Sequence, residues 1–472
     1  MSRKMIVFSA DALVWEDIAY LRTRPNFARL MAHCAQVERV KSIYPSLTYP
    51  CHTTMITGCY PDKHGVLNNN PFRTVSDGAN LYLTDFALVQ AEDIFTAAKR
   101  AGKTTASVYW PVSGNNPNID YLINEYFFPY DEDVEETFRR FGANDDTIAV
   151  VRENMDRLPL VPGETPAGVQ VQLDNCYEHF MNGCVCSLIR RYQPDLLLVH
   201  NCVVDASRHN FGVFGPETIR ALDMLDDWLG EIMAAMEDAG VYDDTDFVLI
   251  SDHGQMDYQK IAHPNTLLRE GGYIDLNDKG EVTGWRAFAH STGMSCIIHM
   301  ADPSDDALRA ELEDFLRTAF QQGKCGIQQV YTEAEVRQRY HMGGDFAFML
   351  ENADGYSFRC DWNSPMITEL TRPKAASHGY LPEKGPWPVF LAAGPSFRPG
   401  AKLPFANLVD EAPTLARVLG DSLPGADGRV MELHNGFMIN NICIWRPYPM
   451  PWPNFGGKMT FDEVNPSKSY EG

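Results

Sequence analysis

The chain has 472 residues, of which 63 are acidic and 40 are basic, so its formal net charge is -23. Its composition, 44% apolar, 11% aromatic and 22% charged, is that of a globular protein and excludes disordered, collagenous and coiled-coil chains. A surface this negative repels nucleic-acid phosphates and anionic lipids, which argues against a partner such as long nucleic acid. The length allows roughly three domains, although α/β enzymes often exceed about 250 residues as one.

No segment of the sequence has the pattern of a secretory signal or a membrane anchor. The apolar run after Arg3 and Lys4 extends only from Met5 to Ala10, which is shorter than a signal core. No apolar stretch approaches the roughly 20 residues of a membrane span. The 11 cysteines are odd in number and irregularly spaced, which favours a reducing compartment over a disulfide framework. We therefore expect a soluble, cytoplasmic protein without a membrane partner.

Short β-rich runs alternate with helical patterns in the first half of the chain, which is typical of βαβ units around a parallel sheet. In chain order, the sequence predicts a strand over residues 4–9, helices over 25–35 and 94–101, a strand over 104–110 and a long amphipathic helix over 217–239. Two runs, 195–200 and 246–251, are apolar without alternation, as in central strands covered on both faces. These patterns predict an α/β fold with a mostly parallel central sheet flanked by helices.

The pattern changes after Tyr258, where short strands mix with a predicted helix over residues 305–320. We interpret residues 259–370 as an inserted, smaller α+β cap subdomain, and residues 1–258 with 371–432 as the catalytic core. Residues 433–472 form a tail rich in proline and aromatic residues, too punctuated for regular structure. The tail packs either on the core or across a homodimer, and the sequence leaves both open.

Three of the predicted strands end in residues that commonly bind metal ions. Asp11 follows the first strand, Asp205 ends the polar cluster after the second, and Asp252 and His253 follow the third. Ligands of open α/β sheets bind at the carboxyl ends of the strands, so these residues indicate a single site.

Carboxylate oxygen and imidazole nitrogen are the ligand types that zinc and similar ions take. The candidates are Asp11, Asp205, His209, Asp252, His253 and His378. Taken singly, each has an ordinary explanation, because a strand-end aspartate most often caps a helix or lies in a turn. A hydroxyl-rich segment, residues 44–54, enters a predicted helix with Thr48 as its N-cap. A helix N-terminus favours an anion, so Thr48 is also a candidate nucleophile.

The segment YPSLTYPCHTTMITGCYPDKHGVLNN at residues 44–69 resembles the nucleophile region of the nucleotide pyrophosphatase/phosphodiesterase family, within the alkaline phosphatase superfamily. Further blocks match the same family in order. They are Ser9-Ala10-Asp11-Ala12, Val108-Tyr109-Trp110-Pro111, Asp205-Ala206-Ser207-Arg208-His209, Ser251-Asp252-His253-Gly254 and Ser377-His378-Gly379-Tyr380. A single block would be weak support, whereas the set in order is specific.

The resemblance implies an alkaline-phosphatase-like fold with two Zn²⁺ ions per chain, for which Mn²⁺ is an alternative. One zinc ion would be held by Asp205, His209 and His378, and the second by Asp11, Asp252 and His253. Thr48 would be the nucleophile, with its oxygen on the second metal. Asn69 would donate a hydrogen bond to a phosphoryl oxygen.

The chemistry of a threonine nucleophile is consistent with this assignment. Its hydroxyl is too weak an acid to attack phosphorus at neutral pH unless a cation stabilises the alkoxide. Two metal ions about 4 Å apart can clamp the attacking and leaving oxygens of an in-line displacement. We therefore predict a hydrolase that cleaves phosphodiester or pyrophosphate bonds of small, nucleotide-like substrates through a phosphothreonine intermediate.

Departures from the family pattern concern the substrate. Tyr49 stands where phenylalanine is usual, and it keeps an aromatic face on which a base could stack. Cys51 stands where asparagine is common, and it lacks the amide. The second stacking tyrosine of the family has no clear match, and we assign this substrate-binding role to Tyr121.

Other activities of the same superfamily remain open. Phosphonoacetate hydrolases also use a threonine nucleophile and a similar metal set. A phosphomonoesterase would need an arginine that clamps the free phosphate oxygens, and none can be placed in the sequence. A sulfatase would need a cysteine or serine nucleophile followed by proline and arginine at set spacing, which this chain lacks. A non-enzymatic binding scaffold would have lost a ligand or the nucleophile, and all of them are present.

Overall fold

The computed structural model describes residues 3–74, 82–126, 133–158 and 176–435. Its centre is an eight-stranded sheet in the order β19-β2-β18-β7-β1-β6-β4-β5. The strands of this sheet are β1 (Lys4–Ala10), β2 (Ala35–Val37), β4 (Thr105–Val108), β5 (Tyr121–Ile123), β6 (Leu196–Asn201), β7 (Thr245–Ile250), β18 (Phe390–Ala393) and β19 (Lys402–Leu403). The strands from β7 to β5 are parallel, and β18 is antiparallel to both of its neighbours. The predicted mostly parallel sheet is confirmed.

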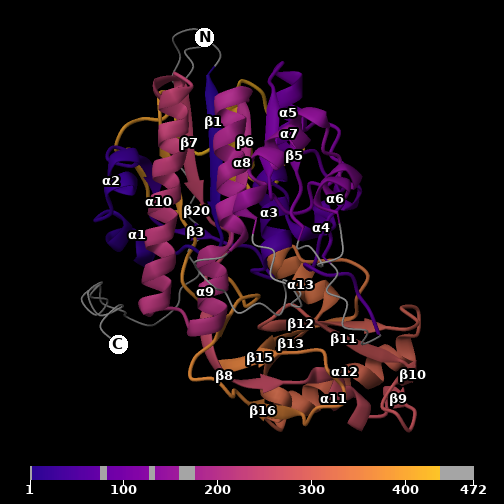
Figure 1. Cartoon of the computed structure of the whole chain (residues 1–472). Helices are drawn as coiled ribbons and strands as arrows, with labels where there is room; N and C mark the ends of the chain where they lie inside the picture. The colour runs from indigo at the N-terminus through magenta and orange to yellow at the C-terminus, as the bar shows by residue number, and fades with distance from the viewer. Residues whose placement is uncertain (1–2, 75–81, 127–132, 159–175, 436–472) are drawn as a thin grey trace.

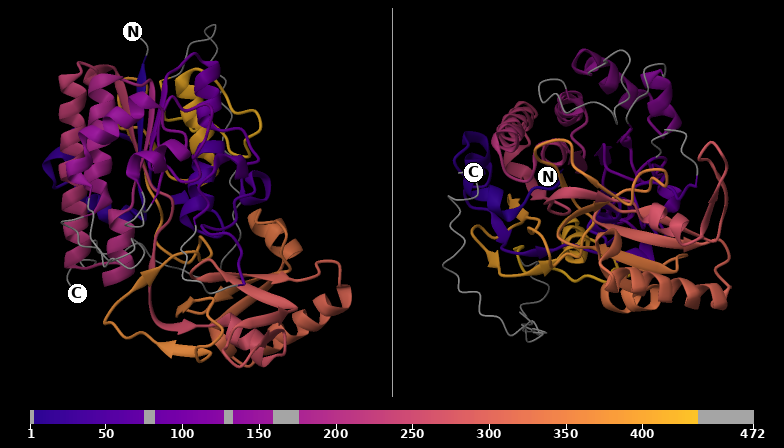
Figure 2. Two further views of the ribbon diagram at one scale, coloured as in Figure 1. Left: turned by 45° about the vertical axis from the view of Figure 1, so that its right-hand side comes forward. Right: turned by 90° about the horizontal axis from the view of Figure 1, so that it is seen from below.

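Helices cover both faces of this sheet, and Figure 2 shows α14 on the opposite side from α8 and α10. Along β1, Ile6 and Phe8 enter the core on one face, while Met5 and Val7 enter the core on the other. Burial on both faces explains why the central strands are continuous apolar runs. The helices around the sheet are α1 (Trp15–Leu21), α2 (Pro25–Leu30), α3 (Thr48–Thr57), α4 (Pro61–His64), α5 (Ile94–Arg100), α6 (Val134–Arg140), α7 (Asp145–Glu153), α8 (Tyr177–Arg191), α9 (Val203–Phe211), α10 (Pro216–Asp238) and α14 (Glu411–Leu419). No helix within the described ranges is both long enough and apolar enough to cross a bilayer.

The long amphipathic helix is confirmed as α10, and Gly240, in a left-handed conformation, follows its end. The helix predicted over residues 25–35 is too long, because α2 ends at Leu30 and Ala35 already begins β2. β2 pairs with β18, in which Ala392 lies opposite Ala35. The partner strand is more than 350 residues away in the sequence, so the local helical pattern could not reveal it.

A second, smaller α+β unit lies below the carboxyl ends of the sheet strands in Figure 1. It has an antiparallel sheet in the order β11-β12-β14-β13, and its hydrophobic core extends from Ala262 to Trp362. The predicted fold, with a smaller α+β unit beside the central sheet, thus agrees with the structure. Its elements and the small sheets beside it are β8 (Met256–Ala262), α11 (Pro264–Glu270), β9 (Ile274–Leu276), β10 (Val282–Trp285), β11 (Ala287–Ser291), β12 (Ser295–Met300), α12 (Asp306–Gln321), β13 (Ile327–Thr332), α13 (Glu333–Tyr340), β14 (Phe348–Asn352), β15 (Gly355–Phe358), β16 (Ile367–Glu369) and β17 (Ala376–Ser377).

The domain boundaries remain a prediction. β8 runs across the expected start of the cap at residue 259, and it pairs both with β15 of the cap and with β17. The short pair β3 (Val40–Lys41) and β20 (Ala406–Asn407) lies beside the core sheet. Of the predicted tail, residues 436–472 lie outside the described residues.

A buried carboxylate ties the cap to the core. Glu351 on β14 is fully buried, and its Oε2 accepts a hydrogen bond from the Tyr44 hydroxyl at 2.9 Å. Its Oε1 accepts from the Leu381 backbone N–H and pairs with the Lys384 ammonium, each at 3.1 Å. Burial raises the pKa of Glu351 to about 7, although Lys384 opposes the shift. Tyr44 is the first residue of the nucleophile segment and Leu381 lies just after His378, so Glu351 holds the cap against both.

Replacing this carboxyl, Glu351→Gln, should flatten the pH dependence of stability. A folded-state pKa that is raised to about 7 gives stability that is present below the ordinary pKa and is lost as the pH rises through about 7. The wild type should therefore lose more unfolding free energy than the variant between about pH 5 and pH 8, because the amide does not titrate. Urea unfolding with a chelator measures both slopes, and equal slopes would contradict the prediction.

Candidate metal centre

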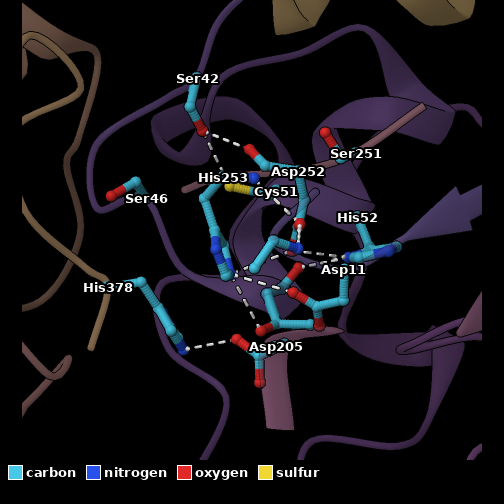
Figure 3. A network of polar contacts seen from close by, with 12 residues as sticks. Asp11, Ser42, Ser46, Cys51, His52, Asp205, Ser251, Asp252, His253 and His378 are labelled. Carbon is cyan, nitrogen blue, oxygen red and sulfur yellow. Dashed lines mark hydrogen bonds and ion pairs between the residues drawn. The ribbon is translucent and has the colours of Figure 1, made fainter. Parts of the chain in front are cut away.

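The predicted ligands meet because three neighbouring parallel strands end at one edge of the sheet. Asp11 follows β1, Asp252 and His253 follow β7, and Asp205 lies on α9 directly after β6. β1 lies between the other two strands, so the three strand ends are adjacent. His378 follows β17 and joins the group from the C-terminal part of the core. Figure 3 shows these side chains turned toward a common centre.

Asp11, Asp252 and His253 form the first cluster, with candidate ligand atoms within 4.8 Å of one another. His253 Nε2 lies 3.1 Å from Asp252 Oδ2 and 3.6 Å from Asp11 Oδ1. All three side chains are buried. The Thr48 hydroxyl lies 3.3 Å from the same His253 Nε2, so the candidate nucleophile adjoins this cluster.

Asp205, His209 and His378 form a second cluster beside it. His378 Nε2 lies 3.1 Å from His209 Nε2 and 3.7 Å from Asp205 Oδ1, while His209 Nε2 lies 3.4 Å from Asp205 Oδ2. His209 Nδ1 contacts the Ala376 carbonyl at 2.8 Å, which orients Nε2 toward the cluster. The rings of His253 and His378 stack with centroids 4.0 Å apart, so the two clusters adjoin.

Burial and charge perturb the pKa values of these groups. Burial, reinforced by the charge of Asp205, raises the pKa of Asp11 to about 6. Burial and then Asp11 raise the pKa of Asp252 well above its ordinary value. Burial lowers the pKa of His378 to about 4, and burial with the charge of His378 lowers the pKa of His253 well below its ordinary value. The site therefore combines neutral imidazoles with crowded carboxylates, which is the donor set of a divalent cation.

Whether a metal ion fits can be judged from two buried carboxylate oxygens of the first cluster. Within the described residues, Asp11 Oδ1 and Asp252 Oδ2 have no hydrogen-bond partner. The other oxygen of each group is satisfied, because His200 Nε2 contacts Asp11 Oδ2 at 3.0 Å and the Ala12 and His253 N–H groups donate to Asp252 Oδ1. Buried carboxylate oxygens without a hydrogen bond are costly, and both of these lie near His253 Nε2. The residues present thus fit a divalent metal ion.

Thr48 has a different helical position from the predicted one. Leu47 is the N-cap of α3 and makes no side-chain capping bond, while Thr48 is the first helical residue. The Thr48 hydroxyl therefore faces His253 instead of capping the helix. Beneath it, buried His52 lies 2.8 Å from the Thr48 carbonyl through Nδ1 and 2.8 Å from Ser9 Oγ through Nε2. His52 thus connects the first turn of α3 to Ser9 on β1 and holds the turn in place.

Asn69 lies beside this first turn. Its Oδ1 accepts a hydrogen bond from the Tyr49 backbone N–H at 2.9 Å. Its own backbone N–H donates to Asn68 Oδ1 at 2.8 Å. With its oxygen facing the helix, the amide NH₂ of Asn69 is the end available to a ligand.

Of the two predicted substrate-binding tyrosines, Tyr49 is buried and Tyr121 lies away from the candidate metal site. Tyr49 is only 2% exposed, its hydroxyl donates to Glu125, and its ring lies 5.5 Å from that of Tyr82. Tyr121 stacks on Tyr192 at 4.4 Å near the start of β5, at the amino end of the parallel strands. Tyr121 is therefore not brought together with the predicted ligands.

Several polar residues around the candidate ligands were not predicted from the sequence. His200 bridges Asp11 and Glu125, and Gln255 donates to Asp205. Burial lowers the pKa of His200, but its bonds to Asp11 and Glu125 outweigh burial and raise it well above the ordinary value. His200 lies near the end of β6, where the polar cluster that leads to Asp205 begins, and this was the available signal. Glu125 gave none, because its neighbours form no recognisable motif.

A variant of one candidate ligand, Asp252→Asn, should respond oppositely to chelator and to metal. In the metal-free protein it should raise the unfolding free energy at neutral pH, because burial and Asp11 disfavour the charged carboxylate. The amide oxygen can still accept the Ala12 and His253 N–H groups. With excess Zn²⁺ the variant should be the less stable one, because it binds the ion roughly tenfold more weakly or worse.

Thermal unfolding in chelator and in excess Zn²⁺ measures both effects. Asp246→Asn is the matched control, since Asp246 is a buried aspartate on β7, the strand that Asp252 follows, and accepts from the Ser396 N–H at 2.8 Å. Its shift should be the same in both conditions. If Asp252→Asn shifts the unfolding temperature in the same direction in both conditions, Asp252 is not a metal ligand.

Comparison with known proteins identifies relatives over most of the chain. A model of the family described as type I phosphodiesterase / nucleotide pyrophosphatase matches residues 5–381. A venom phosphodiesterase of Macrovipera lebetinus is 23% identical over 411 residues, which is 84% of this chain and 40% of the venom protein. Ectonucleotide pyrophosphatase/phosphodiesterase family member 5 of Homo sapiens is 30% identical over 138 residues, 28% of each protein. The chain thus spans less than half of the length of the venom protein.

Solved structures share the fold. Murine ectonucleotide pyrophosphatase/phosphodiesterase 5 superposes with a TM-score of 0.62 at 19% identity, covering 92% of this chain and 100% of that chain. An inactive variant of the murine protein in complex with AMP gives a TM-score of 0.61 at 18% identity, covering 90% and 97%. The family match includes all six candidate ligands, Thr48 and Asn69. The chain belongs to the type I phosphodiesterase/nucleotide pyrophosphatase family.

Proposed function

We propose that this chain hydrolyses phosphodiester or pyrophosphate bonds of small, nucleotide-like substrates through a phosphothreonine at Thr48. The observation that carries the proposal is the position of the Thr48 hydroxyl, 3.3 Å from His253 Nε2 at the first turn of α3 and beside both clusters. Relatives named phosphodiesterases and nucleotide pyrophosphatases support the reaction class. The AMP complex of the murine neighbour supports a nucleotide-like substrate.

Two Zn²⁺ ions are the proposed metals, and Mn²⁺ suits the same donors. Asp205, His209 and His378 would hold one ion, and Asp11, Asp252 and His253 would hold the other together with Thr48. The group of Asp11, Asp252 and His253 and the group of Asp205, His253 and His378 support this assignment. His209 Nε2 lies 3.1 Å from His378 Nε2, and Asp11 Oδ1 and Asp252 Oδ2 have no hydrogen-bond partner among the described residues. Bound there, the ions would favour ionisation of the Thr48 hydroxyl and stabilise charge on the leaving oxygen.

The side chains then have separate tasks. Thr48 Oγ1 attacks phosphorus as the bond to the leaving oxygen breaks on the opposite side, which gives a phosphothreonine with inversion. Asn69 donates from its amide to a phosphoryl oxygen, while its Oδ1 stays bound to the Tyr49 N–H. His52 holds the Thr48 carbonyl and so fixes the nucleophile. Water hydrolyses the phosphothreonine with a second inversion, so the configuration at phosphorus is retained overall.

The charges around the site favour diesters over monoesters. Among the described residues, no arginine or lysine is hydrogen bonded or ion paired to the side chains of the six candidate ligands, Thr48 or Asn69. Arg372 reaches the backbone carbonyl of His209 and the side chain of Asn210, so its guanidinium is engaged there. We infer that a dianionic monoester lacks a bidentate arginine that would stabilise its extra charge. A diester carries one negative charge and does not need it.

Removing the nucleophile, Thr48→Ala, should reduce turnover roughly a thousandfold or more and leave about two bound zinc ions per chain. Thr57→Ala is the matched control, because Thr57 ends the same helix and its hydroxyl bonds the Thr53 carbonyl at 2.8 Å. Turnover of bis-p-nitrophenyl phosphate and zinc content by mass spectrometry measure both quantities. Turnover within tenfold of the wild type in Thr48→Ala would exclude Thr48 as the nucleophile.

The substrate preference can be tested with a panel at fixed zinc concentration. We expect kcat/KM for bis-p-nitrophenyl phosphate to exceed that for p-nitrophenyl phosphate by about tenfold or more, equivalent to about 1.4 kcal/mol of transition-state stabilisation. Dinucleotides, nucleoside triphosphates and phosphonoacetate complete the panel. Preference for the monoester or for phosphonoacetate would overturn the diesterase assignment while leaving the metal site intact.

A further inference from the structure

A buried chain of hydrogen bonds connects a candidate metal ligand with the residue that follows the nucleophile. It runs from Asp11 through His200 and Glu125 to Tyr49. His200 Nε2 lies 3.0 Å from Asp11 Oδ2, His200 Nδ1 lies 3.1 Å from Glu125 Oε1, and the Tyr49 hydroxyl donates to Glu125 Oε2. The exposed fractions of the four side chains lie between 2% and 4%, so water does not compete for these bonds.

The two oxygens of Asp11 have different partners because of this chain. Oδ2 is occupied by His200, whereas Oδ1 has no hydrogen-bond partner among the described residues and faces His253 Nε2 at 3.6 Å. A carboxylate with both oxygens unpaired could rotate and present either one. The bond to His200 therefore selects the oxygen that Asp11 offers to a metal ion.

The remote end of the chain fixes His200 and reaches the nucleophile helix. Glu125 lies just after β5 at the edge of the sheet, where its two oxygens bind His200 and Tyr49 on opposite sides. Tyr49 directly follows Thr48 in α3, and its backbone N–H is bound by Asn69. The position of the Asp11 carboxylate and the position of the first turn of α3 are thus set by one continuous hydrogen-bonded group.

We propose that His200 and Glu125 are positioning residues that hold Asp11 in its metal-binding orientation and couple it, through Tyr49, to the helix that carries Thr48. This inference rests on the metal-binding role proposed for Asp11. It also assigns Tyr49 a task that agrees with its burial, because a hydroxyl bound to Glu125 requires the ring to stay inside the protein.

Zinc titration of the metal-free protein by calorimetry tests the proposal independently of turnover. His200→Gln and Glu125→Gln should each weaken the binding of one zinc ion by about 10-fold to 100-fold and leave the other ion unaffected. Tyr49→Phe, which removes only the remote hydroxyl, should have a smaller effect in the same direction. Glu125→Gln changes one atom, so it keeps the test valid if His200→Gln does not fold.

Two variants serve as matched controls. His64→Gln removes a fully buried histidine that bonds Thr54 Oγ1 at 3.1 Å, and Tyr44→Phe removes a buried hydroxyl that bonds Glu351. Neither bond joins the chain from Asp11 to Tyr49, so zinc affinity should not change in these controls. If His200 had only a structural role, His200→Gln would lower the stability of the protein, as His64→Gln does, but would not change its zinc affinity.

Cobalt substitution gives a spectroscopic readout of ligand geometry. The visible Co²⁺ spectrum should change in His200→Gln and Glu125→Gln and stay as in the wild type in His64→Gln. Asp11→Asn distinguishes failure of the proposed metal site from failure of the positioning proposal. If Asp11→Asn leaves zinc affinity unchanged, the proposed metal site fails; if it weakens affinity while His200→Gln and Glu125→Gln do not, the positioning proposal alone is overturned.

Discussion

The constraint on which the rest of this structure depends is the close approach of carboxylates in a buried place. Burial and then the charge of Asp205 raise the pKa of Asp11, and burial and then the charge of Asp11 raise the pKa of Asp252. One oxygen of each lacks a hydrogen-bond partner within the described chain. Such a group is unfavourable unless a cation compensates it. Neutral histidines on two sides supply further donors without adding positive charge. Crowded buried carboxylates and neutral imidazoles together form a donor set that suits a divalent cation.

The scaffold maintains this arrangement through rigid elements. Parallel strands β1, β6 and β7 present their carboxyl ends side by side, and both faces of the sheet are covered by helices. The cap is held to the nucleophile segment and to the segment after His378 by the buried carboxylate of Glu351. Polar residues beneath the site, His200 and Glu125 among them, orient the ligand side chains. Precise placement of a nucleophile depends on support of this kind.

Several features could be predicted because their signals are local. Apolar runs followed by aspartate or histidine identified the strand ends, and a period of three to four residues identified α10. Other predictions depended on remote contacts. The helix from residue 25 is cut short by pairing with β18, and Tyr121 lies toward the amino end of the strands, on Tyr192. Thr48 starts α3 without capping it, because its hydroxyl faces His253, about 200 residues further along the chain.

The sequence by itself determined the types of candidate ligand, their order along the chain and the parallel strands of the central sheet, because hydrophobic pattern and residue chemistry are local properties. Tertiary structure decided which oxygen of Asp11 is unpaired, why Tyr49 is buried and how Glu125 and His200 reach the site. These contacts join residues 75 or more positions apart. Their geometry depends on how the helices and the cap pack on the sheet, and no local pattern encodes it.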